Sequence, residues 1–261
     1  MKKILLFFCI YPMLVFAQAD SVPRHYEAAF ATIPPVIDGS IDETWKQASW
    51  SADFVDIQGS RQPPPAYRTR IKMLWDRQYL YLLAELEEPH IWATLTKHDA
   101  IIFHDNDFEL FIDPNKDGRQ YFEIEVNAFN TLFELVMSKP YNKGGNMDSS
   151  WNAEGLKSAV KINGTLNNPA DRDTSWLVEM AIPFSSMKRP GRVNQPRPGD
   201  YWRINFSRVQ WNSDVDNGKY IIRKDVSGRK LPEQNWVWSP QGAVNMHIPE
   251  KWGYIYFKPA K

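Results

Sequence analysis

The stretch FIDPNKDGRQYFEIEVN, residues 111–127, decides the fold class because its first half fits two incompatible interpretations. Asp113, Asn115 and Asp117 have the spacing that opens a calcium-binding EF-hand loop. The twelfth loop position, where an EF-hand requires a glutamate, is Ile124. Aspartate, asparagine and glycine are also turn formers. The segment therefore predicts a turn between two strands, and Asp113, Asn115 and Asp117 are only weak candidates for a calcium site.

Both flanks of this turn alternate between polar and apolar side chains, in DFELFID (107–113) and YFEIEVNAF (121–129). A period of two with many aromatic and β-branched residues is typical of strands, whereas an EF-hand needs helices. Similar segments lie near residues 26–32, 67–75, 79–87, 131–138, 157–163, 175–182, 201–209 and 252–258. They predict an all-β fold, an antiparallel two-sheet β-sandwich with one or two short helices. The clearest helix signal is Ser40, a candidate N-cap ahead of IDETWKQ (41–47).

The N-terminus has the pattern of a secretory signal peptide over residues 1–17. Lys2 and Lys3 precede an apolar run that is too short to span a membrane as a helix. We therefore expect an exported protein, periplasmic or extracellular, whose residues 18–261 form a single domain. Cys9, the only cysteine, lies in the signal. The mature chain is thus expected to lack disulfides, cysteine–zinc sites and covalent c-type haem.

Composition restricts the partners of the mature chain. The formal net charge of the full chain is zero and no basic run or strip is present, so neither nucleic acid nor an anionic membrane is an expected partner. We expect no membrane span after the signal. Aromatic residues make up 14% of the chain, with 11 Trp. That number exceeds what one core ordinarily needs, which suggests that some rings line a ligand surface.

Seven segments together resemble one family, carbohydrate-binding module family 9, in their order and spacing. They are PPVIDGSIDETW (34–45), WDRQYLYLLAEL (75–86), DNDFELFID (105–113), YFEIEVNAFNT (121–131), WLVEMAIPF (176–184), GDYWRINFSRVQW (199–211) and HIPEKWGYIYF (247–257). The resemblance implies a β-sandwich that acts as a non-catalytic carbohydrate-binding protein. Its expected ligands are the ends of plant or other oligo- or polysaccharides, bound in support of glycan breakdown. Glycoside hydrolases of the same export system are candidate partners.

The resemblance also predicts residues of the carbohydrate-binding site. Members of the family hold a sugar between two aromatic side chains, and polar strand residues bind its hydroxyls. By this resemblance Glu109 and Asn127 match polar contact positions. His247, ahead of the proline in HIPEKWG, lies beside one of the two clamp segments.

The sugar clamp itself departs from the family pattern. Phe103 and Met246 stand where the two clamp tryptophans are expected, and Glu125 replaces a basic contact residue. Trp236 and Trp238, two residues apart in NWVWSPQG, could supply a replacement stacking platform. The alternative is that these two rings cap the core of the sandwich.

The glutamates of the two central strands allow three interpretations. Glu109 and Glu125 could form the floor of a binding site, face solvent, or act as the paired carboxylates of a glycan-active hydrolase or lytic accessory protein. No recognisable nucleophile motif is present. We expect no required cofactor, and a structural calcium ion is the bound ion that the sequence suggests. A haem- or metal-carrying module is a further alternative, although Met246 and His247, adjacent in sequence, cannot reach opposite faces of a haem iron.

Overall fold

The computed structural model describes residues 22–260, which are mostly β-structure. The predicted signal peptide, residues 1–17, lies outside the described residues. The strands are β1 (His25–Phe30), β2 (Val55–Asp56), β3 (Thr69–Trp75), β4 (Tyr79–Glu87), β5 (Asp107–Asp113), β6 (Tyr121–Asn127), β7 (Leu132–Met137), β8 (Met147–Asp148), β9 (Lys157–Asn163), β10 (Ser175–Pro183), β11 (Tyr201–Gln210), β12 (Ser213–Asp216), β13 (Lys219–Ile222), β14 (Gln234–Val237) and β15 (Gly253–Phe257).

Short 3₁₀ helices interrupt the loops between these strands. They are η1 (Glu43–Gln47), η2 (Gly59–Arg61), η3 (Ile102–His104), η4 (Tyr141–Lys143), η5 (Phe184–Met187) and η6 (Pro249–Lys251). None of the helices in residues 22–260 combines the length and the apolar character that a membrane crossing requires.

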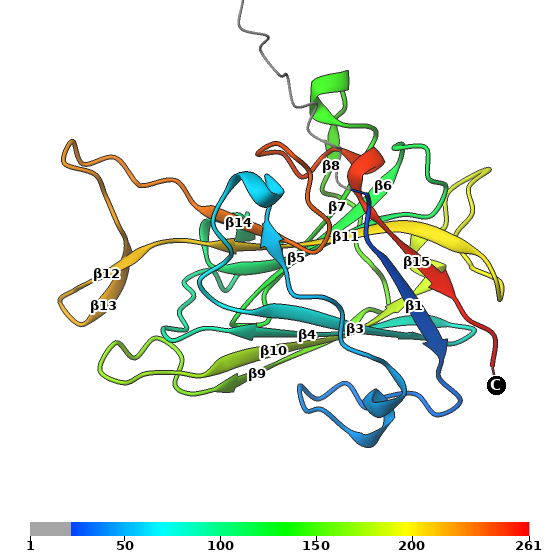
Figure 1. Ribbon diagram of the computed structural model, residues 1–261, viewed down its shortest axis with the longest axis horizontal. Helices are drawn as coiled ribbons and strands as arrows, with labels where there is room; N and C mark the ends of the chain where they lie inside the picture. Colours follow the sequence, from blue (N-terminus) through cyan, green and yellow to red (C-terminus); the bar gives the residue numbers. More distant parts are fainter. Residues whose placement is uncertain (1–21, 261) are drawn as a thin grey trace, which may run out of the picture.

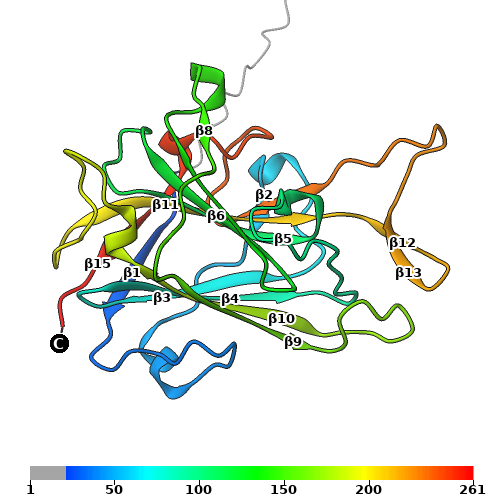
Figure 2. The same ribbon diagram turned by 180° about the vertical axis from the view of Figure 1, so that it is seen from behind.

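Thirteen strands join into one hydrogen-bonded sheet that curls into two layers. The main path runs β8-β7-β6-β5-β11-β15-β1-β3-β4-β10-β9, and β14 and β2 branch from β11. One layer contains β5, β11 and β14, and the other contains β3, β4, β9 and β10 (Figure 1). The separate hairpin β12–β13 projects from one end of the molecule (Figure 2).

Strand β1 accounts for two differences from the predicted antiparallel, two-sheet arrangement. Its residues 25–28 pair in parallel with β15, and residues 29 and 30 pair in parallel with β3. The sheet is therefore mixed rather than purely antiparallel. Because β1 crosses from one layer to the other, the layers are also continuous along the hydrogen-bonded path.

The core between the layers is built by the alternation noted in the sequence. Phe108, Leu110 and Ile112 of β5 point into it, and each is completely buried. They meet Leu82 and Met180 of the opposite layer in the same apolar cluster. The other side chains of β5 and β6, including the glutamates, must then lie on the outer face of this layer.

The turn between β5 and β6 confirms the strand interpretation over the EF-hand. The Asp113 carboxylate accepts hydrogen bonds from the Lys116 and Gly118 backbone N–H groups, at 2.9 and 2.8 Å. Gly118 has a φ of 67°, a conformation in which a residue without a Cβ is favoured. The strands expected near residues 67–75 and 79–87 are confirmed as well, and they form an antiparallel hairpin as β3 and β4.

The predicted helix start at Ser40 is wrong by two residues. Asp42 is the N-cap of η1, and its side chain accepts a hydrogen bond from the Thr44 N–H at 2.7 Å. Ser40 instead accepts a hydrogen bond from Lys161 Nζ. Both residue types are good N-caps, so local sequence could not separate them.

Candidate functional site

Three glutamates form the floor of a pocket on the outer face of the β5–β6 layer. The strand register places Glu109 directly opposite Glu125, and Phe111 opposite Glu123. Each glutamate is only 5% exposed, although the face it lies on points away from the core between the layers. The interpretation of Glu109 and Glu125 as a solvated face is therefore wrong, because loops cover them.

Asp107 extends this acidic floor along β5. Asp107, Glu109 and Glu125 can each offer one oxygen such that the three oxygens lie within 4.8 Å of one another. Asp107 Oδ1 accepts a hydrogen bond from the Val209 N–H, whereas Asp107 Oδ2 is buried without a hydrogen-bond partner among residues 22–260. Glu123 Oε2 is in the same situation.

Burial and mutual repulsion hold protons on this cluster. Burial raises the pKa of Glu109 to about 7. For Glu123 and Glu125, burial raises the pKa well above the usual range, and neighbouring carboxylates raise it further. Ionising two buried carboxylates that face each other costs free energy, because the two negative charges repel each other. The floor can thus present both hydrogen-bond donors and acceptors near neutral pH.

Loops that are distant in sequence form the walls above the floor, around a cavity of about 440 Å³. In Figure 1 the green segment with η4 and the orange-to-red loop before η6 lie above this layer. The rim carries exposed apolar side chains, namely Ile101, Tyr141, Met147 and Val244. Tyr141 is 51% exposed, and its ring stands edge-on to the His247 ring with centroids 4.7 Å apart.

His247 lines the pocket as the family resemblance implies. Its Nδ1 shares a hydrogen bond with the Tyr121 hydroxyl at 2.8 Å. Burial lowers the pKa of His247 to about 4, so the imidazole is neutral at physiological pH. It can orient a ligand through a hydrogen bond but supplies no positive charge there.

The two residues at the altered clamp positions both line the pocket. Phe103 packs edge-on against Trp211, with ring centroids 5.7 Å apart, and its N–H donates to Glu125. Met246 is only 8% exposed. The structure therefore brings together Phe103, Glu109, Glu125 and His247, four of the seven residues predicted to bind carbohydrate.

The other three predicted residues do not line this pocket. Trp236 and Trp238 are 2% and 1% exposed in the core cluster, so the prediction of an exposed stacking platform is wrong. The alternative, that the rings cap the core, is the one the structure supports. The Asn127 amide donates hydrogen bonds to the Leu95 carbonyl and to the Asp105 carboxylate. These bonds hold the loop that contains Leu95 and Asp105, so the Asn127 side chain has a structural role.

The calcium candidates of the β5–β6 turn are engaged by protein groups. Asp113 accepts from the two backbone N–H groups described above, and Asn115 accepts from the Val193 N–H. The Arg192 guanidinium binds both oxygens of Asp117 at 2.7 Å. A guanidinium in this position competes with a metal cation for the same carboxylate. Calcium at this turn stays a prediction that the geometry does not favour.

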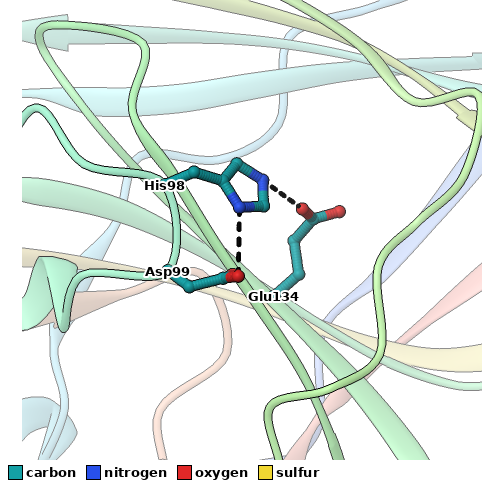
Figure 3. Close-up of side chains that lie close together, drawn as sticks. All are labelled: His98, Asp99 and Glu134. Carbon is teal, nitrogen blue, oxygen red and sulfur yellow. Dashed lines mark hydrogen bonds and ion pairs between the residues drawn. The ribbon is translucent and has the colours of Figure 1, made fainter.

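Figure 3 shows a second cluster, His98, Asp99 and Glu134, and none of these residues lines the pocket. His98 bridges Asp99 and Glu134, with both nitrogen–oxygen distances 3.1 Å. The three side chains could hold a metal ion by their spacing. Here the imidazole already contacts both carboxylates, and Glu134 also accepts from the Ala153 N–H. The cluster is therefore complete without a ligand.

Comparison with known proteins places this geometry in a family. Residues 37–230 match the family described as carbohydrate family 9 binding domain-like. The chain belongs to this family. Family 9 membership confirms the resemblance found in the sequence, and it fits a pocket that combines an apolar rim with buried polar groups.

Curated relatives of this family 9 chain are much longer proteins. It is 27% identical over 213 residues to endo-1,4-beta-xylanase C of Paenibacillus barcinonensis, covering 78% of this chain and 17% of that protein. It is 28% identical over 185 residues to endo-1,4-beta-xylanase A of Thermoanaerobacterium saccharolyticum, covering 71% and 13%. The chain thus spans less than a fifth of these relatives.

Solved structures share the fold. A family 9 module from Caldicellulosiruptor kristjanssonii in complex with cellotriose superposes with a TM-score of 0.56 at 17% identity, covering 91% of this chain and 95% of that one. A crystal structure of a Bacteroides uniformis protein gives a TM-score of 0.65 at 17% identity, covering 91% and 100%.

Proposed function

We propose that this chain is an exported, non-catalytic carbohydrate-binding protein, and that its pocket above β5 and β6 binds the end of an oligo- or polysaccharide in support of glycan breakdown. One observation carries the proposal. In a member of a carbohydrate-binding family, an exposed apolar rim surrounds a buried row of carboxylates within a single cavity of about 440 Å³. Other hollows of the described chain, about 580 and 870 Å³, lack such a row of buried carboxylates.

The chemistry of the pocket suits a sugar ring. A pyranose has apolar C–H faces and hydroxyl groups at its edge. Covering roughly 60 Å² of such a face with Tyr141 is worth about 1.5 kcal/mol. Each hydroxyl that donates to a carboxylate adds a charge-assisted hydrogen bond. After the cost of association, these contacts correspond to affinities between about 1 mM and 1 μM.

Calorimetric titration with soluble oligosaccharides tests the proposal. Wild-type protein should bind cellotetraose or xylotetraose, and Tyr141→Ala should weaken that binding roughly tenfold because it removes the exposed ring. Tyr256→Ala is the matched control, since Tyr256 is 38% exposed on β15 and outside the pocket. Failure of both saccharides to bind, or equal binding by Tyr141→Ala, would contradict the proposal.

Two parts of the proposal have their own tests. Export through residues 1–17 predicts a mature protein cut after Ala17, which intact-mass measurement of secreted or periplasmic material would detect. The same oligosaccharides should show no new reducing ends after incubation. Turnover that Glu109→Gln abolishes would replace binding with the hydrolase alternative through Glu109 and Glu125.

A further inference from the structure

The charged groups that line the pocket are all acidic. Glu109, Glu123 and Glu125 form the floor, and Glu233 joins them from the segment before β14. No lysine or arginine is among the described residues that line this cavity. The one basic side chain, His247, is neutral as described above. A ligand entering the pocket therefore meets carboxyl groups from several sides and no cationic side chain among the described lining residues.

Two oxygens of this acidic cluster also have no hydrogen-bond partner among the described residues. Asp107 Oδ2 and Glu123 Oε2 are buried, and no hydrogen-bond donor within residues 22–260 reaches them. Buried carboxylates are normally hydrogen-bonded or paired with a cation. The orphaned Glu123 oxygen belongs to a side chain that lines the cavity and is only 5% exposed. It marks a position where an incoming donor would complete the site.

Another buried acid in this chain is completed by the fold. Glu179 is fully buried on β10, and its two oxygens accept hydrogen bonds from the Asp38 and Gly39 N–H groups and from the Trp45 indole. The fold thus provides hydrogen-bond donors to both oxygens of this buried carboxylate. The acidic cluster at the pocket differs, because it contains buried oxygens without a hydrogen-bond partner among the described residues. This difference distinguishes the pocket acids as groups available to a ligand.

We propose that the pocket selects saccharides that carry a protonated amine, that is, amino sugars with a free ammonium group, over neutral saccharides of the same linkage. This inference rests on the carbohydrate-binding function proposed above. An ammonium group has three N–H donors. Glu109 and Glu125 both line the cavity, and one oxygen of each lies within 4.8 Å of the other, so the two carboxylates can converge on one such group.

The rim favours an amino sugar over a bare metal ion. Tyr141 and Met147 expose apolar surface above the carboxylates, and a sugar ring can cover that surface with its C–H face. A metal ion would use the carboxylates alone. The cavity volume of about 440 Å³ also falls in the range of small-molecule sites, about 300–1,000 Å³.

Three β-1,4-linked tetrasaccharides that differ only at C2 test the inference. Cellotetraose carries a hydroxyl there, the N-acetylglucosamine tetramer an acetamido group, and the glucosamine tetramer an ammonium group. Titration calorimetry near pH 7 at low salt should give binding of the glucosamine tetramer about 10- to 100-fold tighter than either neutral tetramer. Binding should also release protons from the floor, detected as a binding enthalpy that changes with the ionisation enthalpy of the buffer.

Isosteric variants locate the effect. Glu109→Gln and Glu125→Gln keep the shape of the floor but cannot release a proton to form a carboxylate, so each should weaken binding of the glucosamine tetramer about tenfold or more. Each should also weaken cellotetraose binding, but by a smaller factor, because the Gln side-chain oxygen still accepts a hydrogen bond from a hydroxyl group. Glu154→Gln makes the same residue exchange at an exposed position outside the pocket and should leave all three affinities unchanged.

The outcomes separate this inference from the proposed function. Equal or tighter binding of cellotetraose overturns the preference for amines while carbohydrate binding stands. Absence of binding by all three tetramers overturns both. Calcium chloride titrated alone is the remaining arm. A calcium signal that Glu109→Gln abolishes, together with no preference for the glucosamine tetramer, would assign the carboxylates to a metal ion instead.

Discussion

Buried carboxylates lie on both sides of strand β11, and the two sides differ in the partners that the fold provides for them. On the core side, Arg208 Nη2 lies 2.8 Å from Glu88 Oε2, and the two side chains are 1% and 3% exposed. Gln210 Oε1 accepts two more hydrogen bonds from the guanidinium. On the opposite side, Ser207 pairs across the strands with Glu109, and no lysine or arginine of the described residues lines the pocket with the acids there.

This difference separates stability from binding within one sheet. Burial raises the pKa of Glu88, and Arg208 offsets part of that rise, so the pair is largely satisfied inside the fold. Burial raises the pKa of Asp107 as well, but neighbouring Glu109 and Glu125 raise it further. The core-side acid is bound to its partner, whereas the pocket acids hold protons that a ligand can replace.

Removing the cation on the core side should have the largest effect. Arg208→Met leaves Glu88 buried and uncompensated, so the free energy of unfolding should fall by about 3–5 kcal/mol. Urea denaturation at pH 7 measures this as a lower midpoint with a similar slope. Adding Glu88→Gln to Arg208→Met should recover part of the loss, because the unpaired charge is then gone. A loss below about 1 kcal/mol in the single variant would show that the two sides of β11 do not differ as described.

Neutralising an acid on the pocket side should do the opposite and stabilise the protein. The folded-state pKa of Glu109, about 7, lies above its ordinary value of 4.5. Between these values the folded state binds more protons than the unfolded state, so stability falls as pH rises. The full shift corresponds to roughly 3 kcal/mol. Glu109→Gln should therefore match wild type near pH 4 and exceed it by about 1–3 kcal/mol at pH 8.

Denaturation midpoints at pH 4 to 8 measure this difference. His247 contributes with the reverse sign, because its pKa is lowered to about 4 and its stabilisation is lost as pH falls from 6.5. That contribution is common to wild type and Glu109→Gln, so the difference between the two proteins isolates Glu109. Exposed Glu154→Gln should show no comparable trend. Glu109→Gln less stable than wild type at pH 8 would mean that the fold stabilises the ionised Glu109 carboxylate, which contradicts the raised pKa.

The sequence predicted the strands of this comparison well because each has one apolar face. The expected strand at 107–113 coincides with β5, and the turn after it was recognised from its aspartates. Strand β14 was missed because Trp236, Val237 and Trp238 are all buried, so neither polarity nor period two marks the strand. The proline and glycine that follow in NWVWSPQG are typical of a loop rather than a strand.

The pocket floor was predictable, but its cover was not. Alternation identified Glu109 and Glu125 as the polar face of a sheet, without indicating whether solvent or protein lies above them. The cover comes from segments near residues 101–103, 141–147 and 244–247, which meet only in the folded chain. Tyr141 was missed for this reason. An aromatic residue within the turn-rich segment KPYNKGG was the only local signal for it.

Removing the histidine of the His98 cluster should change the free energy of unfolding least among these variants (Figure 3). Its imidazole lies between two carboxylates, but the His98 side chain is 53% exposed and that of Asp99 is 39% exposed. Water and salt screen such contacts, so His98→Gln should cost less than about 1 kcal/mol. Glu134 keeps its hydrogen bond from the Ala153 N–H in the variant, which avoids an orphaned buried group.

Thermal denaturation of His98→Gln at low and high salt tests whether burial is what separates the clusters. The small loss at low salt should shrink further near 1 M salt, where the screening length falls to about 3 Å. Arg208→Met should keep its loss under the same conditions, because water and ions do not reach a pair that is 1% and 3% exposed. If His98→Gln instead lost as much as Arg208→Met, independent of salt, charge pairing rather than burial would determine the stability of these sites.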